Sequence, residues 1–200
     1  HQVFGLLLLY LTEQRGLRGP LVRSLTSTGM VDRLGERFGV EVFEMPVGFK
    51  YIGPKFTETN ALIAGEESGG FAFQGHIPER DGIVAGLLAA DMIVDYGKPL
   101  SAIVAHLEEL VGPHAYSRHD IRLPREGYEA RKAEMYTQIR EHQPTDLAGS
   151  KVVRTRTDDG FKFYLEDGSW VLLRMSGSEP LIRVYCESAD PPRVQTLPAV

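Results

Sequence analysis

The stretch LVRSLTSTGMVDRLGERFGVEVFEMP, residues 21–46, contains two short apolar segments separated by an amphipathic one. LVRSL (21–25) and EVFEMP (41–46) have the length and composition of buried strands, whereas the apolar residues of MVDRLGERF recur with helical spacing. Thr28 is a suitable N-cap for this helix, and Gly39 is a suitable residue to end it. A strand, a helix and a second strand in this order predict an α/β unit with parallel strands.

The same alternation continues on both sides of this stretch. The further elements predicted in this part are a helix over 3–14, a third strand over 61–65, a helix over 82–96 with Asp81 as its N-cap, and a helix over 100–111. Strands that alternate with helices are typical of layered α/β proteins. The fold class predicted for residues 1–115 is therefore α/β, as a three-layer α/β/α domain with a mainly parallel sheet.

The pattern changes in the second part of the chain. The segment 114–127 is polar and is interpreted as a loop-rich boundary, and the segment 126–142 has the spacing of one amphipathic helix. The strands predicted after it are KVVRTRT (151–157), FKFYLE (161–166), SWVLLR (169–174) and LIRVYCE (181–187). Asp-Gly pairs between alternating segments indicate hairpins. Residues 116–200 are therefore predicted to form a small α+β domain with an antiparallel sheet.

Composition narrows the class of protein. The chain has 200 residues, of which 42% are apolar and 24% charged, as in a folded protein, and its net charge of −5 argues against nucleic acid as a partner. The apolar run VFGLLLLYL is shorter than the roughly 20 residues of a membrane span, so no membrane partner is expected. The single cysteine, Cys186, favours a reducing, cytoplasmic location. The start at His1, directly before this run, suggests a piece of a longer protein.

The connection MSGSEP between the last two predicted strands is a candidate phosphate site. Arg174 ends one strand and Arg183 lies on the next, while Ser176, Gly177 and Ser178 offer hydroxyl groups and backbone N–H groups between them. Two guanidinium groups beside such a loop match the oxygens of a phosphate. The alternative is an ordinary Ser/Gly turn flanked by two surface arginines.

GEESGG, residues 65–70, is a second candidate loop. Glu66 and Ser68 could bond to sugar hydroxyls, or the loop is simply acidic and solvated. Lys50 lies between two glycines in VGFKYIG (47–53), a predicted loop that follows the second strand at the sheet edge where ligands of α/β folds bind. Arg80 precedes the capping Asp81. Each of these cations could instead be a solvated surface residue. The six histidines show no metal-binding spacing, and no G-x-S-x-G nucleophile motif is present.

Taken together, VGFKYI, GEESGG, ERDGI and RMSGSEPLIRVY resemble the motifs of the α-D-phosphohexomutases, the phosphoglucomutase and phosphomannomutase superfamily. The likeness runs from the first helix to about Glu187 and implies the third and fourth of that family's four domains. By this resemblance Glu66 and Ser68 bind the hexose hydroxyls, and Lys50 and Arg80 face the reacting phosphate. The loop residues implied to bind the other phosphate are Arg174, Ser176, Gly177, Ser178 and Arg183.

The resemblance also implies a reaction. A phosphoserine gives its phosphoryl group to one sugar oxygen, the bisphosphate reorients, and the other phosphate returns to the serine. The serine loop of the T-A-S-H-N-P kind and the D-G-D-x-D-R magnesium loop are not found in this sequence, because in the family both belong to the first two domains. We therefore expect no catalytic or metal-binding residue in the chain and no activity of the chain alone. The implied partners are a hexose phosphate and the N-terminal domains, with Mg²⁺ and glucose 1,6-bisphosphate as cofactor and intermediate.

Three details of the sequence, of which the last two depart from the family pattern, concern the sugar-binding loop, the phosphate loop and the C-terminal tail. GEESGG resembles the glucose-preferring members and GEMSGH is typical of those with dual specificity, so a phosphoglucomutase is favoured. The alternatives are a phosphomannomutase of mixed specificity and a non-catalytic module that binds sugar phosphates. Glucosamine-phosphate mutases, which usually carry a loop close to GEQSGH, rank behind the two hexose mutases. Ser178 stands where threonine is more usual, which keeps the hydroxyl. The tail ADPPRVQTLPAV does not resemble the family's closing helix.

Overall fold

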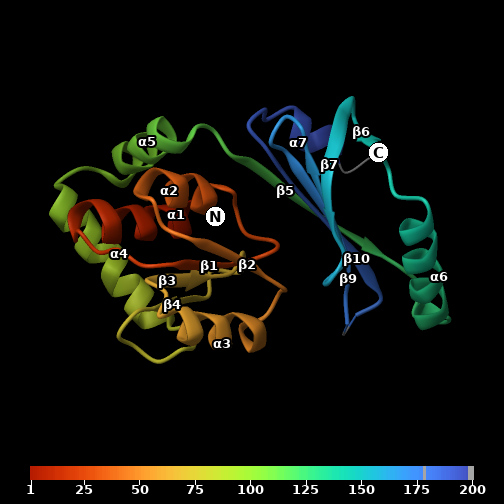
Figure 1. Cartoon of the computed structure of the whole chain (residues 1–200), viewed down its shortest axis with the longest axis horizontal. Coiled ribbons are helices and arrows are strands. Elements are labelled where there is room, and N and C mark those ends of the chain that lie inside the picture. The colour runs from red at the N-terminus through yellow and green to blue at the C-terminus, as the bar shows by residue number, and fades with distance from the viewer. Residues whose placement is uncertain (178, 198–200) are drawn as a thin grey trace. The chain divides into compact units, whose positions relative to one another are not determined.

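The structure is a computed structural model that describes residues 1–177 and 179–197. Ser178 and the last three residues lie outside the described part. The chain divides into two compact units, His1–Pro113 and His114–Val200, and each is described by itself (Figure 1).

The first unit is built on a four-stranded sheet in the order β2-β1-β3-β4. Its strands are β1 (Leu21–Ser24), β2 (Val42–Met45), β3 (Ile63–Gly65) and β4 (Phe71–Phe73). The first three are parallel, with Leu21 paired to Val42 on one side and to Ile63 on the other. The three predicted strands are confirmed. β4, which runs antiparallel to β3, was not predicted, because three residues are too few to show a periodic pattern.

Helices cover both faces of this sheet (Figure 1). They are α1 (Gln2–Leu9), a π-helical turn η1 (Tyr10–Gln14), α2 (Met30–Phe38), α3 (Phe49–Thr59), α4 (Gly82–Tyr96) and α5 (Leu100–Val111). Leu21 and Ile63 share one hydrophobic core with α1, α2, α4 and α5. Val22 and Ala64, whose side chains alternate with these along the strands, share a second core with α3. The predicted three-layer α/β/α architecture is confirmed.

Two local predictions in this unit were wrong. The segment 47–53 was expected to be a loop, but it enters α3 at Phe49. The glycines that suggested a loop have other roles: Gly48 is the N-cap at φ 120°, and a Cβ on Gly53 would lie 2.9 Å from the Pro78 carbonyl oxygen. The N-cap of α2 is Gly29, not Thr28, although the Thr28 hydroxyl accepts a hydrogen bond from the Met30 amide (3.1 Å).

The second unit is a six-stranded sheet in the order β5-β10-β9-β8-β7-β6, with antiparallel neighbours. The strands are β5 (Ala115–Arg122), β6 (Asp146–Leu147), β7 (Ser150–Arg156), β8 (Phe161–Leu165), β9 (Trp170–Met175) and β10 (Leu181–Ser188), with helices α6 (Tyr128–Glu141) and α7 (Arg193–Thr196). Phe161, Met175 and Val184 form an apolar core against which Tyr136 and Ile139 of α6 pack. The predicted small α+β domain with an antiparallel sheet is confirmed.

β5 corrects the interpretation of segment 114–127 as a loop. Its sequence, AYSRHDIR, lacks the alternation of apolar and polar residues that marks a half-buried strand. The strand forms because all of it pairs with β10, from Ala115 opposite Ser188 to Arg122 opposite Leu181. Tertiary pairing therefore decides the conformation of this segment.

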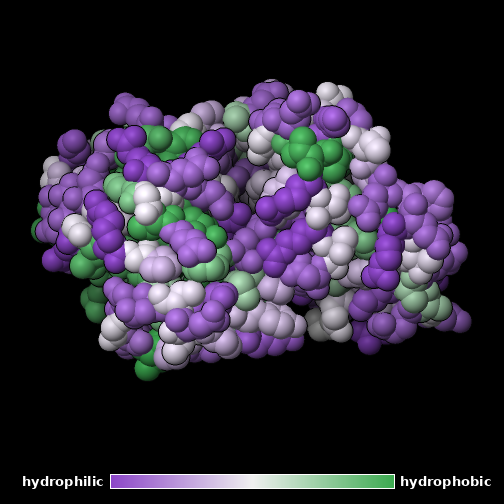
Figure 2. Space-filling model, in the orientation of Figure 1, coloured by the Kyte–Doolittle hydropathy of each residue, from purple (hydrophilic) through white to green (hydrophobic). Residues whose placement is uncertain are grey.

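The surface is mainly hydrophilic on the face shown in Figure 2, with separate apolar patches. Several exposed apolar side chains lie on α4, among them Ile83, Leu87 and Val94. Within residues 1–177 and 179–197, no helix is long and apolar enough to cross a membrane.

Candidate functional site

The GEESGG loop lies at the carboxyl edge of the parallel strands. It is the turn from β3 to β4, in which the Glu66 amide donates to the Gly70 carbonyl (3.0 Å) and the Gly69 amide donates to the Glu66 carbonyl (3.1 Å). Gly69 adopts φ 87°, which favours glycine. Because β1, β2 and β3 are parallel, the loops that follow them share this edge, where α/β proteins bind ligands.

Glu66 connects three segments of this edge. Its carboxylate accepts a hydrogen bond from the Gly48 amide at Oε1 (2.9 Å) and from Arg80 Nη1 at Oε2 (3.2 Å), while its side chain is only 7% exposed. A carboxylate with ionic and backbone donors is well compensated for burial. The sequence had suggested a residue facing either ligand or solvent, and the structure shows one that already fixes its neighbours.

Arg80 lies over the same turn. Its Cζ is 5.6 Å from the centroid of the Phe49 ring, and a Cβ on Gly70 would come within 2.9 Å of its Cδ. The next residue, Asp81, is the predicted N-cap of α4: its Oδ1 accepts from the Ile83 and Val84 amides at 2.9 and 3.0 Å. Because the Asp81 amide also donates to Phe71 of β4, Arg80 is held beside the GEESGG turn.

The two remaining residues predicted for this edge are both exposed. Ser68 lies at the tip of the β3–β4 turn. Lys50 lies in the first turn of α3, not in a loop, and its Nζ is 4.8 Å from the centroid of the Tyr51 ring. The structure thus brings Glu66 and Arg80 together, whereas Ser68 and Lys50 take no part in the ion pair between them.

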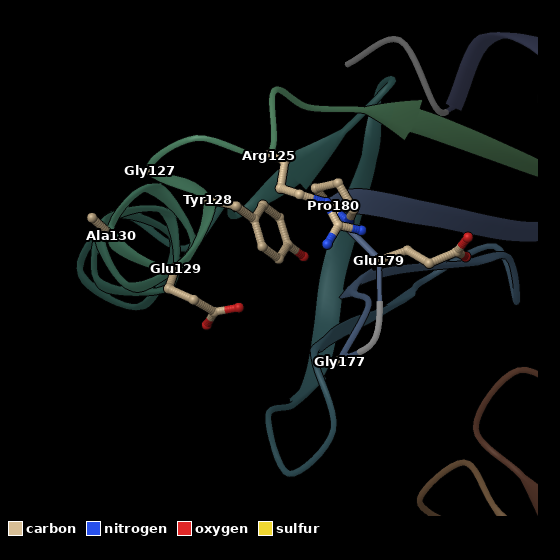
Figure 3. Close-up of a pocket in the computed structure, with 8 residues that line it drawn as sticks. All are labelled: Arg125, Gly127, Tyr128, Glu129, Ala130, Gly177, Glu179 and Pro180. Atoms are coloured by element: carbon tan, nitrogen blue, oxygen red, sulfur yellow. The ribbon is translucent and has the colours of Figure 1, made fainter.

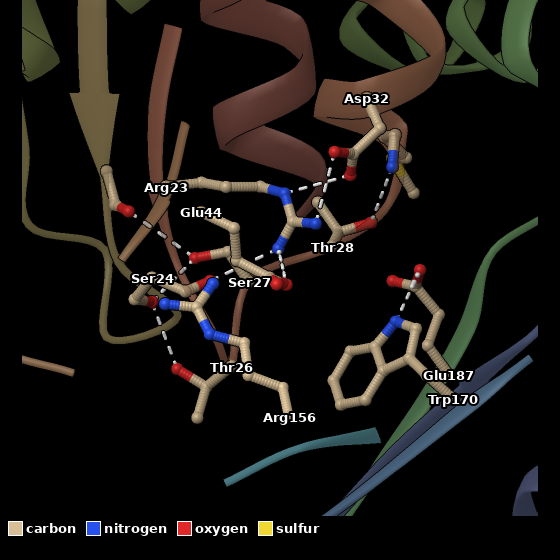
Figure 4. A network of polar contacts seen from close by, with 12 residues as sticks. Arg23, Ser24, Thr26, Ser27, Thr28, Asp32, Glu44, Arg156, Trp170 and Glu187 are labelled. Carbon is tan, nitrogen blue, oxygen red and sulfur yellow. Dashed lines mark hydrogen bonds and ion pairs between the residues drawn. The ribbon is translucent and has the colours of Figure 1, made fainter. Parts of the chain in front are cut away.

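A polar network at the end of β1, which was not predicted from the sequence, completes this edge (Figure 4). Arg23 forms ion pairs with Asp32 of α2 (2.8 Å) and with Glu44 of β2 (2.7 Å). Beside it, the Ser24 and Ser27 hydroxyls lie 2.8 Å apart. The one sequence signal for this network is an arginine within the apolar strand LVRSL.

The second unit contains the predicted phosphate loop between β9 and β10. Arg174 and Arg183 are opposite each other in the antiparallel register, so their side chains share one face of the sheet. Their side chains are 19% and 24% exposed. The alternating neighbours Leu173, Met175, Ile182 and Val184 belong to the core with α6, so the arginines lie on the opposite face. The pairing of these two residues across the loop agrees with the predicted hairpin.

The loop itself is held by α6. The Ser176 amide donates to the Leu181 carbonyl (3.0 Å), and the Tyr128 hydroxyl donates to the Ser176 carbonyl (3.0 Å). The Ser176 hydroxyl accepts from the Glu179 amide (3.2 Å). Burial raises the pKa of Tyr128 above its ordinary value, which keeps this phenol protonated as a donor. Gly177 lies in the same loop, and Ser178 is outside the described residues.

Acidic residues accompany both arginines. Asp159 accepts a hydrogen bond from Arg174 Nε (2.9 Å), and Asp120 and Glu179 lie 4.0 and 3.6 Å from Arg183. Hydrogen bonds from Arg118 hold the pKa of Asp120 below its ordinary value, and the charges of Arg118, Arg183 and Arg122 lower it further. Sequence reasoning missed these carboxylates. The Asp-Gly pair at 159–160 was interpreted only as a turn signal.

A cavity of about 330 Å³ adjoins the loop on the side of α6 (Figure 3). Its lining residues are Arg125, Gly127, Tyr128, Glu129, Ala130, Gly177, Glu179 and Pro180. Glu179 therefore borders this cavity and also lies 3.6 Å from Arg183.

No group of three or more His, Cys, Asp or Glu residues that could hold a metal ion occurs in the described part of the chain. We assign none of the described residues to magnesium.

Comparisons with known proteins match both units of the chain to one family. Residues 1–110 match the family model "Phosphoglucomutase/phosphomannomutase, alpha/beta/alpha domain III", and residues 128–199 match "Phosphoglucomutase/phosphomannomutase, C-terminal domain". A phosphoglucomutase/phosphomannomutase from Thermococcus kodakarensis is 30% identical over 173 residues, which are 85% of this chain and 34% of the relative. A phosphoglucomutase from Rhizobium radiobacter is 27% identical over an alignment of 199 residues, gaps included, that covers 88% of this chain and 35% of the relative.

A solved structure of this family is also similar to the chain. A Thermus thermophilus protein assigned as a phosphomannomutase superposes with a TM-score of 0.77 and 36% identity, over 98% of this chain and 38% of its own. The chain therefore spans about a third of the length of the curated relatives it matches. On these matches the chain belongs to the phosphoglucomutase/phosphomannomutase family, of which it carries domain III and the C-terminal domain.

Proposed function

We propose that the chain is the substrate-binding half of a phosphoglucomutase that interconverts glucose 1-phosphate and glucose 6-phosphate. Residues 1–115 would bind the hexose, and residues 116–200 would bind its non-reacting phosphate. The observation that carries the proposal is the cross-strand pair of Arg174 and Arg183 beside the Ser176–Pro180 loop. Paired guanidinium groups and loop N–H groups suit a phosphate dianion better than any neutral ligand.

The residues of the chain would bind and orient the substrate. Arg174, Ser176, Gly177, Ser178 and Arg183 would hold the phosphate that does not react. Because the enzyme would have to bind the bisphosphate in either orientation, this phosphate site would accept the phosphate of either carbon.

The hexose would lie against the GEESGG loop. Each oxygen of the Glu66 carboxylate has two lone pairs, so oxygens that accept from Gly48 and Arg80 can still accept from sugar hydroxyls. The exposed Ser68 would add a second polar contact, and Arg80 and Lys50 would face the reacting phosphate. These contacts would position the sugar rather than take part in bond breaking.

The reaction itself would require other parts of the enzyme. In the first half-reaction the bond between phosphorus and the serine oxygen would break as one forms to a sugar oxygen, whose hydroxyl loses its proton. In the second half-reaction the bond between phosphorus and the oxygen of the other carbon would break, that sugar oxygen would regain a proton, and the serine oxygen would lose its proton as its bond to phosphorus forms again. The serine, the magnesium ion and glucose 1,6-bisphosphate would belong to the complete cytoplasmic enzyme, and the chain alone would be inactive. No step is assigned to Mg²⁺ through the residues described.

A second candidate is a phosphomannomutase of mixed specificity. It is favoured by the 36% identity to the Thermus protein assigned as a phosphomannomutase. The GEESGG sequence favours glucose by resemblance. A third, non-catalytic module that binds sugar phosphates would use the same residues and would differ in having no catalytic partner domains.

Isothermal titration of the 200-residue chain with glucose 1-phosphate and with mannose 1-phosphate tests the proposal. We expect binding that falls at least about tenfold in Arg174→Ala, because a charge-assisted pair of hydrogen bonds is lost. Arg140→Ala, which removes an exposed arginine from α6, is the matched control and should bind as the original chain does. Equal losses in both variants would reject the phosphate site. Tighter binding of mannose 1-phosphate would favour the second candidate.

A further inference from the structure

The turn between β7 and β8 contacts the end of β9. Gly160 adopts φ 101°, and a Cβ at this position would lie 2.5 Å from the Leu173 carbonyl oxygen and 3.2 Å from Arg174 Cα. Only glycine permits so close an approach of two backbones. The residue before it, Asp159, is thereby placed next to the Arg174 side chain, although the two are 15 residues apart in the chain.

The contact between these two side chains is short and largely shielded. Asp159 Oδ1 accepts from Arg174 Nε at 2.9 Å, and the side chains are 22% and 19% exposed. A charge-assisted hydrogen bond at this depth is stronger than an exposed ion pair. It also restricts a side chain that is otherwise among the most flexible.

The bond uses one particular nitrogen of the guanidinium. Because Nε and the two terminal nitrogens lie in one plane, a partner on Nε fixes the direction in which Nη1 and Nη2 point. The terminal pair is the edge that binds two oxygens of a phosphate side by side. A carboxylate on Nε is therefore compatible with phosphate on the other edge.

Asp159 also reduces a repulsion that the phosphate site creates. Arg174 and Arg183 are opposite each other on adjacent strands, and like charges in that position destabilise a sheet. A carboxylate beside Arg174 offsets the repulsion, whereas it also weakens the attraction for an anion. Whether removal of Asp159 weakens or tightens phosphate binding would show which of these two effects is larger.

We propose that Asp159 is a positioning residue of the phosphate site: it orients the guanidinium of Arg174 so that Nη1 and Nη2 face a phosphate dianion. The inference rests on the proposed function of Arg174. Asp159 lies outside the MSGSEP loop and would nevertheless determine the affinity for phosphate. It also gives the Asp159-Gly160 turn a role besides closing a hairpin.

The test follows the arginine Nε–H signals of the 200-residue chain by NMR during a titration with inorganic phosphate. The Arg174 signal, identified by its loss in Arg174→Ala, should shift on phosphate addition. In Asp159→Ala it should change position before phosphate is added, and the midpoint of the titration should rise about tenfold because the side chain must be ordered on binding. Asp159→Asn keeps an acceptor oxygen, so its midpoint should stay within about threefold of the original.

Two further variants separate position from charge. Asp158→Ala removes the same charge from the same turn, where Asp158 pairs with Arg156, and should leave the midpoint unchanged. Asp159→Glu keeps the charge but displaces the carboxylate by one methylene. If Asp159 acts by positioning Arg174, this variant should lose as much phosphate affinity as Asp159→Ala does. If Asp159 acts only through its charge, the affinity should not change. This variant decides the question if the alanine variant does not fold.

The outcomes separate the inference from the proposed function. An unchanged or lower midpoint in Asp159→Ala, with phosphate still sensed at Arg174, overturns the positioning role and leaves the phosphate site intact. The positioning role is also overturned if Asp158→Ala and Asp159→Ala weaken phosphate binding equally. No response of Arg174 to phosphate in the original chain overturns the site, and the inference with it.

Discussion

Arg174 of β9 and Arg183 of β10 lie directly opposite each other across the hairpin that carries the SGSEP loop. Their charges are balanced unequally: Arg174 bonds to the shielded Asp159, whereas Arg183 lies 3.6 Å from Glu179, whose side chain is 57% exposed. An exposed carboxylate is a weak ion-pair partner. Glu179 is therefore a weakly held counter-ion of Arg183, which a phosphate would displace if the proposed function is correct.

Glu179→Gln is expected to tighten phosphate binding by about two- to fivefold, because it removes a carboxylate that competes for Arg183 at an exposed site. Isothermal titration with glucose 1-phosphate measures the change. The gain should shrink as salt is added, since exposed charges are screened. Glu134→Gln removes an exposed carboxylate from α6 and serves as control. Weaker binding in Glu179→Gln would mean that Glu179 supports the loop.

Glu66→Ala is expected to lower the free energy of unfolding by about 1–3 kcal/mol, because it leaves the Gly48 amide without its acceptor at a partly buried position. Urea denaturation followed by circular dichroism measures this loss. Glu79→Ala removes a carboxylate that is 56% exposed and 3.7 Å from the same Arg80, and should change stability by less than about 0.5 kcal/mol. Similar losses in the two variants would contradict a structural role for Glu66.

Gly160→Ala is expected to destabilise the second unit by about 2 kcal/mol or more, because the new Cβ would overlap the Leu173 carbonyl oxygen. Gly149→Ala separates this overlap from backbone strain: Gly149 also has a positive φ, 77°, but nothing lies within 4 Å of its Cβ position. We expect about 1 kcal/mol there. Unfolding is followed by fluorescence of Trp170, the single tryptophan and a residue of β9. Equal losses would contradict the close approach.

The elements predicted correctly are those whose signals are local. The apolar segments of β1 and β2, the Asp81 cap and the Gly39 stop each depend on a few consecutive residues. α3 was missed because Gly48 and Gly53 carry the signals of a loop, while their actual causes are a positive φ and the nearby Pro78 carbonyl. Such causes become visible only in three dimensions.

The same holds for the candidate site: features set by neighbouring residues could be predicted, whereas features set by tertiary packing could not. The position of Arg183 opposite Arg174 could be predicted, because both flank one short hairpin loop. The approach of Asp159 to Arg174 could not, since it requires the packing of the β7–β8 turn against β9. The bond from Gly48 to Glu66 likewise joins loops that follow two different strands. The sequence therefore suggested the cations of the candidate site, whereas the carboxylates beside them became visible only in the structure.

The first unit is expected to lose stability at acid pH when the carboxylate of Asp81 becomes protonated. The Val84 amide, the His76 side chain and the Ile83 amide all bond to its carboxylate and hold its pKa below the ordinary value of about 3.9. A carboxylate whose pKa is lower in the folded state stabilises that state above the ordinary pKa. This stabilisation is lost as the pH falls through the lower, folded value.

Asp81→Asn isolates this contribution, because asparagine can still cap α4 but cannot ionise. The original chain should therefore be the more stable at pH 7, and the difference should vanish as the pH falls below the folded pKa of Asp81. Urea denaturation of both chains between pH 7 and pH 2 measures the difference. Glu109→Gln, which removes an exposed carboxylate from α5, tests whether a change of net charge alone gives the same result. A difference that stays constant with pH would show that Asp81 acts through shape and not through its charge.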